Sequence, residues 1–438
     1  MKPRNRWVVI SLTMMTAIVT GCNLNDNPEE PEIPDGSGAL KLTRAELEMV
    51  NHSNDFSFNL FKQIIDSRSA DESLKKQSII VSPISITYAL GMLNNGAAGN
   101  TQKQINTALG FGSTGTDNIN DFCLKMLKSV PALDSKTKIM IANNIYLNKE
   151  YKLYSDFINK ANTYYYAYPE TRDFHDGMTM DVINKWASDH TDKMIQKILD
   201  EKSFNPDAVS YLLNAIYFKG EWTNKFDINY TVEEDFWRCS INYTDATTCP
   251  MMHMTTELEY GYVDGYQVLR LPYGNKSFQM TILLPDASCI CYDDVLPDPK
   301  DPLFMMPLPS AETWSQINSK MSSYLIDLKL PRFETTTDIE LPKIMAALGM
   351  PDAFNPDKAD FSKFCKTPTY IGLMKQVARI KLDEEGTEAT AVTVIGMDNT
   401  AVSKEPKIIY FHANHPFIYI ISESSSNAIF FIGQYTGY

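Results

Sequence analysis

The chain has little of what a hydrolase needs. Its 438 residues include only six histidines, and neither an H-E-x-x-H nor a G-x-S-x-G motif occurs. Zinc hydrolases use the first motif and α/β-hydrolases use the second. Residues 110–115 match G-x-G-x-x-G, but this match follows a helical stretch and opens no clear helix, so we expect a turn instead of a nucleotide site. We therefore expect no enzyme, no cofactor and no metal.

Basic residues are also scarce. Lys and Arg number 40 against 54 Asp and Glu, which gives a formal net charge of −14. Such an excess argues against nucleic acid and anionic lipid headgroups as partners. Apolar residues make up 44% of the chain, with 21 Phe and 23 Tyr among the aromatics, which is ample for a large core. No internal repeat is evident.

The N-terminal apolar run is too short to span a bilayer comfortably. It extends from Trp7 to Val19 and follows Lys2, Arg4 and Arg6. A basic start before a run of this length is typical of a signal peptide, which we assign to residues 1–21.

Cys22 follows the small residues Thr20 and Gly21. This context resembles the bacterial lipobox, which implies cleavage before Cys22 and its lipidation; an ordinary signal peptide with an incidental cysteine is the alternative. Residues 22–45 are polar, acidic and rich in Pro and Gly, so we expect a flexible tether. The mature chain would carry 37 basic and 54 acidic residues, a net charge of −17. We expect a bacterial, extracytoplasmic protein, periplasmic, surface-exposed or extracellular, that meets a membrane only through its lipid.

Six further cysteines remain after Cys22. Cys239 and Cys249 flank a plausible hairpin, so their pairing is the disulfide we expect outside the cytoplasm. The sequence gives no pairing for the other four, Cys123, Cys289, Cys291 and Cys365.

Hydrophobic periodicity indicates helices and strands in one chain. A helix is expected after the cap Ser53-Asn54-Asp55, and a second over Ile183–Ile198. Alternation indicates strands at Val377–Leu382, Phe417–Ile421 and Ile429–Ile432.

An acidic bend followed by small residues lies about fifty residues before the C-terminus. It reads Glu384-Glu385-Gly386-Thr387-Glu388-Ala389-Thr390-Ala391-Val392-Thr393. With the period of two of a strand, one face carries uncharged, small residues, whereas Glu388 lies on the other face. Such a segment suits a strand that slips between two existing strands and packs one face on the core, where an unpaired charge would cost several kcal/mol.

Other segments follow in a recognisable order. They are Ser82-Pro83-Ile84-Ser85-Ile86, Gly96-Ala97-Ala98-Gly99-Asn100-Thr101, Asn214–Trp222 with Phe226, Leu330-Pro331-Arg332-Phe333, Leu348–Phe354, Ala359-Asp360-Phe361-Ser362, Phe411–Phe417 and Ile429–Gly433. Together with the acidic bend they make the chain resemble the serpins, serine protease inhibitors whose reactive loop inserts into their own main sheet. The resemblance covers roughly residues 50–438.

This resemblance implies an α+β fold with three β-sheets, about eight or nine helices and an exposed reactive-centre loop. It favours one domain, residues 46–438, over the two or three domains that this length usually suggests. The reactive loop would span about residues 384–406. We expect a monomer.

The resemblance also assigns roles to single residues. The hinge would comprise Glu384, Glu385, Gly386, Thr387, Glu388, Ala389, Thr390 and Ala391. Arg332 matches the basic residue that pairs with Glu384, and Gly386 supplies freedom to bend. A solvated surface contact and a plain turn glycine are the alternatives for this pair and this glycine.

A second cluster would lie where the sheet parts. Trp222 matches the tryptophan of the central strand, and Ser82, Ser85 and Asn214 match the hydrogen-bonding cluster. The chain departs from the family at Gln376, which stands where a histidine is usual. An amide does not titrate near neutrality, so sheet opening should lack a histidine-driven pH response.

Family spacing from Gly386 places the scissile bond near Thr400 and Ala401, with a register uncertain by a few residues. The small and medium apolar side chains there suit elastase-like serine proteases, whereas Lys404 would suit trypsin-like ones. The implied function is suicide-substrate inhibition of serine proteases, with cysteine proteases as a second class of target. A non-inhibitory serpin that binds or carries a ligand and a glycan-binding surface lipoprotein are the alternatives.

Overall fold

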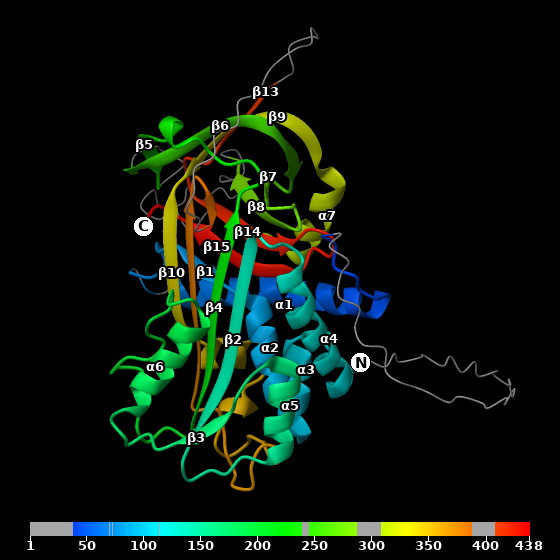
Figure 1. The fold of residues 1–438 in the computed structure, drawn as a ribbon, viewed down its shortest axis with the longest axis vertical. Coiled ribbons are helices and arrows are strands. Elements are labelled where there is room, and N and C mark those ends of the chain that lie inside the picture. The colour runs from blue at the N-terminus through cyan, green and yellow to red at the C-terminus, as the bar shows by residue number, and fades with distance from the viewer. Residues whose placement is uncertain are drawn as a thin grey trace, which may run out of the picture. The chain divides into compact units, whose positions relative to one another are not determined.

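The computed structural model describes residues 38–69, 71, 73–112, 114–238, 245–286, 308–387 and 408–438. These residues lie within the unit Ile33–Tyr438 (Figure 1). Eight α-helices and two mixed sheets are present in this part of the chain, which confirms the α+β class. The helices are α1 Arg44–Arg68, α2 Pro83–Asn94, α3 Gly99–Ala108, α4 Thr116–Ser129, α5 Ser155–Tyr165, α6 Thr179–His190, α7 Ala311–Lys320 and α8 Pro342–Ala347.

Helix α1 begins ten residues before the expected one. Thr43 accepts a hydrogen bond from the Glu46 backbone N–H, and the Glu46 carboxylate accepts one from the Thr43 N–H. This capping box outcompetes the Ser53-Asn54-Asp55 signal, because it satisfies two free N–H groups at once. Those three residues therefore lie inside the helix.

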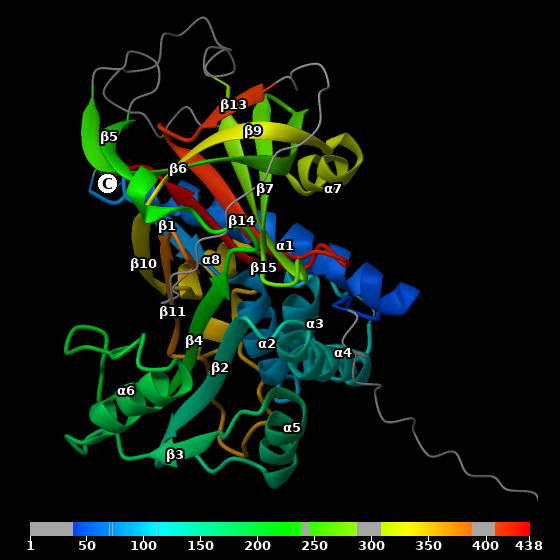
Figure 2. The ribbon, with the colours of Figure 1, turned by 45° about the horizontal axis from the view of Figure 1, so that its top comes forward.

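The six-stranded sheet has the strand order β10-β11-β12-β4-β2-β3 (Figure 2). Its strands are β2 Thr137–Asn148, β3 Glu170–Arg172, β4 Ser210–Glu221, β10 Phe333–Glu340, β11 Leu373–Asp383 and β12 Gly386–Thr387. β4 and β11 are parallel and pair directly over Tyr211–Tyr217 and Leu373–Arg379. The short β12 lies between them at one end and is antiparallel to both.

The nine-stranded sheet has the order β1-β15-β14-β8-β7-β6-β9-β13, with β5 paired to β6. Its strands are β1 Ile79–Val81, β5 Val232–Trp237, β6 Ala246–Val263, β7 Tyr266–Tyr273, β8 Phe278–Pro285, β9 Ser322–Pro331, β13 Ile408–His412, β14 Phe417–Glu423 and β15 Ile429–Tyr435. The 18-residue β6 pairs with β5 along its first part and with β9 and β7 farther on. Through this one strand, two of the three expected sheets are joined into one network.

Helices cover both faces of the six-stranded sheet. Every residue of α2 is buried, as expected for a helix that is apolar all round, and α2 contacts β2 and β4. On the opposite face, α6 and the chain after it enclose a second apolar cluster with Leu213, Val377 and Ile183. Figure 1 shows α6 in front of the lower part of β4.

Helix α6 is shorter than predicted. It ends at His190, and the chain then turns through Asp192 and Lys193, both with positive φ. Met194 and Ile198 continue the apolar pattern, but they lie in the non-helical chain that follows α6. Residues 110–112 form the expected turn, with Gly110 and Gly112 at positive φ, although α4 does begin directly after Gly115.

Candidate functional site

The acidic bend forms a tight hairpin at one end of the six-stranded sheet. β11 leads into the turn Glu384-Glu385, and Gly386 and Thr387 return as β12. Gly386 pairs with Asp383 on one side and with Glu221 on the other. Its φ is +151°, and a Cβ there would lie 2.0 Å from the Gly220 carbonyl oxygen. Only glycine can bring the backbone this close to β4.

Thr387 is the last described residue of the hinge, and its side chain is completely buried. Its hydroxyl lies 2.8 Å from the Tyr273 hydroxyl on β7. Tyr273 stacks on Trp222 with ring centroids 4.4 Å apart. Burial raises the pKa of Tyr273 far above its ordinary value, so this hydroxyl stays protonated as a hydrogen-bonding group.

The backbone of the turn is held by the chain that follows β4. The Trp222 indole N–H donates to the Asp383 carbonyl at 3.0 Å, and its backbone N–H donates to the Glu385 carbonyl at 2.8 Å. Phe226 donates its N–H to the Glu384 carbonyl at 2.9 Å. The tryptophan therefore supports the hinge by direct contact with its backbone.

The two turn carboxylates face different partners. Glu384 is buried, lies 3.5 Å from the Arg332 guanidinium and accepts a 2.7 Å hydrogen bond from the Thr231 hydroxyl. Glu385 lies 2.6 Å from the Lys225 ammonium group. Burial alone would lower the pKa of Lys225, but the carboxylates of Glu385 and Glu221 outweigh burial and raise it. Gly386 and Thr387 are already in the sheet while the Arg332–Glu384 pair is formed, so this pair does not keep those two residues out.

A row of three amides crosses the sheet farther down. Asn143 on β2, Asn214 on β4 and Gln376 on β11 are register partners. The Gln376 amide donates to Asn214 Oδ1 at 2.6 Å, and the Asn214 amide donates to Asn143 Oδ1 at 2.7 Å. The direct bond between Gln376 and Asn214 closes the space between β11 and β4 at this level.

Helix α2 supplies the rest of this cluster. Gln376 donates to the Ser82 carbonyl and to the Ser85 hydroxyl at 3.0 Å each, and accepts from the Ser82 N–H at 3.0 Å. Ser85 donates to Asn214 Oδ1 at 2.7 Å. The expected residues Ser82, Ser85, Asn214 and Gln376 therefore form one connected hydrogen-bonded cluster, to which Ser82 contributes its backbone groups, and all four are buried.

The chain after α6 covers the opposite face of the sheet along the slot, by which we mean the line where β4 and β11 pair directly. Arg379 on β11 donates to the Met194 carbonyl at 3.2 Å and pairs with Glu334 on β10 at 2.7 Å. The buried Asn184 of α6 accepts hydrogen bonds from the N–H groups of Ile198 and Leu199. Any strand that enters between β4 and β11 must pass beneath this cover.

Some predicted residues have no described position. They are Cys22, Glu388, Ala389, Thr390, Ala391, Thr400 and Ala401, which lie outside the described residues. The sequence prediction missed Asn143, Tyr273, Lys225 and Thr231. Asn143 carried a usable signal, because it is a polar residue in the middle of an apolar strand and such a residue needs a buried partner.

The expected disulfide between Cys239 and Cys249 is wrong for Cys249, which has a free, buried thiol. The hairpin register places Cys249 opposite Glu234, and Cys239, five residues on, lies outside the described residues. Cys123 and Cys365 are also free and buried. Burial raises the pKa of Cys249 to about 11 and that of Cys123 to about 12, so neither is a reactive thiolate near neutral pH.

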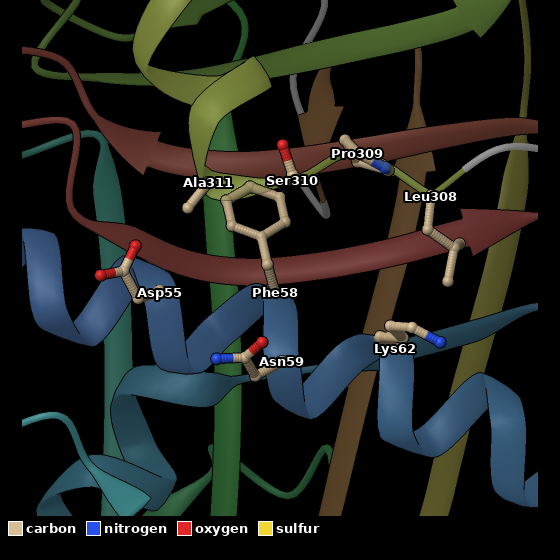
Figure 3. A pocket seen from close by; sticks show the side chains of 8 residues that line it. All are labelled: Asp55, Phe58, Asn59, Lys62, Leu308, Pro309, Ser310 and Ala311. Carbon is tan, nitrogen blue, oxygen red and sulfur yellow. The ribbon is translucent and has the colours of Figure 1, made fainter.

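Within the described ranges, no group of three metal-ligating side chains and no helix able to cross a membrane is found. A cavity of about 540 Å³ lies between α1 and the start of α7, away from the hinge (Figure 3). Its lining residues are Asp55, Phe58, Asn59, Lys62, Leu308, Pro309, Ser310 and Ala311.

The fold and the hinge define a class of protein in which the segment after β11 returns as a short strand between β11 and β4. The family model for "Serpin (serine protease inhibitor)" matches residues 51–437. Serpin B3 of Homo sapiens is 30% identical, and the match covers 87% of this chain and 97% of that protein. Leukocyte elastase inhibitor of Xenopus tropicalis is 29% identical with the same coverage.

Solved structures agree with this match. Tengpin, a thermophilic serpin in its native state, gives a TM-score of 0.77 at 28% identity and covers 91% of this chain and 95% of its own. Thyroxine-binding globulin in complex with thyroxine gives 0.74 at 25% identity, with coverage of 89% and 99%. The chain belongs to the serpin family, whose typical members inhibit proteases and are not enzymes.

Proposed function

We propose that the protein inhibits serine proteases, with cysteine proteases as a second class of target, by trapping them as suicide substrates. The observation that carries the proposal is β12. Its two residues already pair on both sides between β11 and β4, while the rest of the slot is closed by direct β4–β11 pairing. β12 is thus the first part of a strand that the rest of the loop could extend between β11 and β4.

The proposed reaction starts at the loop. The protease nucleophile attacks the Thr400 carbonyl carbon, the Thr400–Ala401 bond breaks, and the new amine leaves with Ala401. Thr400 remains as an acyl ester on the protease. Because the loop is now severed, the segment after Thr387 is free to insert and carries the protease with it, which distorts the protease before water releases the ester.

The register of β12 supports a specific position for each residue that would insert. Thr387 lies opposite Gly220 on β4 and Leu382 on β11. If this register continues, Thr393 arrives between Asn214 and Gln376. Insertion breaks the Gln376–Asn214 hydrogen bond, and the Thr393 hydroxyl, on the face that points to the core, can bond to both amides in its place.

Energy for the trap comes from the exchange of strand partners. Seven residue pairs between parallel β4 and β11 would be replaced by antiparallel pairing on both edges of the new strand, which is slightly more stable per residue. About a dozen new hydrogen bonds at ~1 kcal/mol each give on the order of 10 kcal/mol. This is comparable to the whole stability of a typical domain.

The direct test is a protease panel. Incubation with elastase-like, trypsin-like and papain-like enzymes should give a denaturant-resistant complex with at least one of them, visible on a gel, and sequencing should place the cut between residues 394 and 404. Cleavage there should also raise the thermal midpoint sharply. If every enzyme merely cleaves the loop and the midpoint does not rise, the protein is not an inserting inhibitor.

The proposed location follows from the N-terminus. Cleavage before Cys22 and its lipidation would anchor the mature protein to a bacterial membrane, in the periplasm or on the surface. The acidic tether of residues 22–45 lets the inhibitor reach proteases away from the membrane. We propose a monomer with elastase-like targets.

A carrier function is the alternative. It is favoured by the cavity between α1 and α7 and by the likeness to thyroxine-binding globulin, whose structure holds thyroxine. The hinge argues against a carrier function, because Gly386 and Thr387 are small, uncharged and already paired within the sheet. A carrier need not gain stability when its loop is cut, so the thermal midpoint after cleavage separates the two functions.

A further inference from the structure

Strand β13 presents two apolar side chains to solvent where the loop re-enters the fold. Ile408 is the first residue of β13, and Tyr410 lies two residues on, so both point to the same face. They are 40% and 64% exposed. In the described residues β13 has a strand partner on one side only, β9. We call Ile408 and Tyr410 the β13 face.

The charged groups beside the β13 face already pair with one another. His412 lies 3.1 Å from Asp327, the register partner of Tyr410 on β9. Lys329 pairs with Glu234 at 2.8 Å. The Tyr410 ring contacts the His412 ring edge-on, with centroids 5.8 Å apart. Asp327 and Lys329 thus each have a polar partner, and the Tyr410 ring, which contacts the His412 ring on one side, remains exposed.

The short chain between the proposed scissile bond and β13 limits how far a bound protease can lie from the β13 face. From Ala401 to Ile408 there are seven residues, which reach about 25 Å when fully extended, whereas the thirteen residues from Thr387 to Thr400 reach about 45 Å. A protease domain of roughly 230 residues is about 45 Å across. An enzyme bound at Thr400 is therefore held within about 25 Å of the start of β13, a distance shorter than its own diameter. Figure 1 shows β13 at the end of the fold opposite β3.

From this geometry we infer that the β13 face is a second contact surface for the target protease in the encounter complex. The inference rests on the proposed inhibition and adds a determinant of partner choice outside the cleaved loop. Rigid aromatic side chains supply much contact area at a low entropy cost. Insertion later carries the acylated enzyme away from β13, so the contact acts on association and not on the final trap.

The test compares Tyr410→Ala with the matched control Tyr168→Ala. Tyr168 is also 64% exposed but lies near β3. With pancreatic elastase and trypsin as probes, Tyr410→Ala should lower the association rate constant about tenfold for the enzyme that the parent traps, while the stoichiometry of inhibition stays unchanged. Tyr410→Phe should retain most of the rate, and an unchanged thermal midpoint shows that β13 still folds.

Three results would overturn the inference. They are an unchanged association rate, an equal loss in Tyr168→Ala, or a change in stoichiometry alone. If Tyr410→Ala instead converts a dimer to a monomer in sedimentation, a second copy of the chain covers this face. Absence of a covalent complex between the parent and both probes would overturn the proposed inhibition of elastase-like and trypsin-like enzymes, and this inference with it, whereas a normal complex with no effect of Tyr410→Ala overturns only the second contact surface.

Discussion

Trp222 and Tyr273 stack with their planes 12° from parallel, and Tyr273 holds the Thr387 hydroxyl on its far end. The chain that follows β4 of one sheet is thereby joined to β7 of the other sheet, next to the first residues of the loop. The stacked rings form a fixed surface on which Thr387 packs. Substitutions at Thr387 should therefore disturb the native protein even before a protease binds.

Thr387→Arg should turn the inhibitor into a substrate. A guanidinium cannot replace a completely buried threonine hydroxyl without a large desolvation cost, so β12 would leave the sheet and insertion after cleavage would stall. We expect the stoichiometry of inhibition to rise severalfold, measured by titration of a protease that the parent traps. Thr336→Arg is the control, because Thr336 lies on β10 of the same sheet with its side chain exposed. Equal stoichiometry in parent and Thr387→Arg would contradict the hinge assignment.

Thr393→Val should lower the thermal stability of the cleaved form only. If Thr393 bonds to Asn214 and Gln376 after insertion, the valine leaves the hydrogen bond that insertion breaks between these two buried amides unreplaced, at a cost of about 1–3 kcal/mol. The native thermal midpoint should match that of the parent, and the midpoint after cleavage should be lower. A cleaved form as stable as the cleaved parent would show that the register shifts during insertion.

Stability should fall as the pH falls below about 6.5, because of His415. Burial lowers the pKa of His415 in the folded protein, although the Pro285 carbonyl and Asp286 oppose this effect. Below the ordinary histidine value the unfolded chain takes up a proton that the folded chain does not, so stability is complete above that pH and is lost as the pH falls through it. His415→Gln should flatten the thermal midpoint between about pH 7.5 and about pH 5.5; an unchanged slope would exclude this histidine as the cause.

Cys22→Ser should release the mature protein from the membrane fraction or leave an unprocessed precursor. The acidic tether offers neither a second acyl chain nor a basic patch to replace the lipid. Fractionation followed by immunoblotting measures the effect, and the cytosolic and integral membrane proteins of the same cells serve as markers. Membrane retention equal to that of the parent would refute lipidation at this residue.

Thr400→Arg should shift inhibition from elastase-like to trypsin-like enzymes and leave the insertion step intact. The specificity of a protease depends mainly on the side chain that enters its primary pocket, and Thr400 follows Thr387 by thirteen positions in the sequence. Association rates with both enzymes and mass spectrometry of the acylated residue provide the measurement. A trypsin complex acylated at Lys404 in the parent, at near one-to-one stoichiometry, would show that the scissile register is wrong by a few residues.

Local pattern predicted much of this fold and less of its site. Alternation located β11, β14 and β15 correctly, because each buries apolar side chains over a regular strand. The start of α1 was missed because two capping signals competed and the stronger one came earlier. Cys249 was assigned a wrong partner because hairpin register, which sequence spacing does not specify, sets what lies opposite. Tyr273 could not be predicted, since its role depends on contacts between β7 and residues more than a hundred positions away.

Gly386 and Thr387 already pair with the sheet, and this affects which step limits the rate of loop insertion. Adding a strand to a sheet is slow at nucleation, when the chain is ordered before many bonds repay it, and fast at propagation. Here the nucleus exists before cleavage, with pairing on both edges. In the proposed trap, only propagation would remain when the scissile bond breaks, so insertion would compete with hydrolysis of the acyl ester from a nucleus that is already formed.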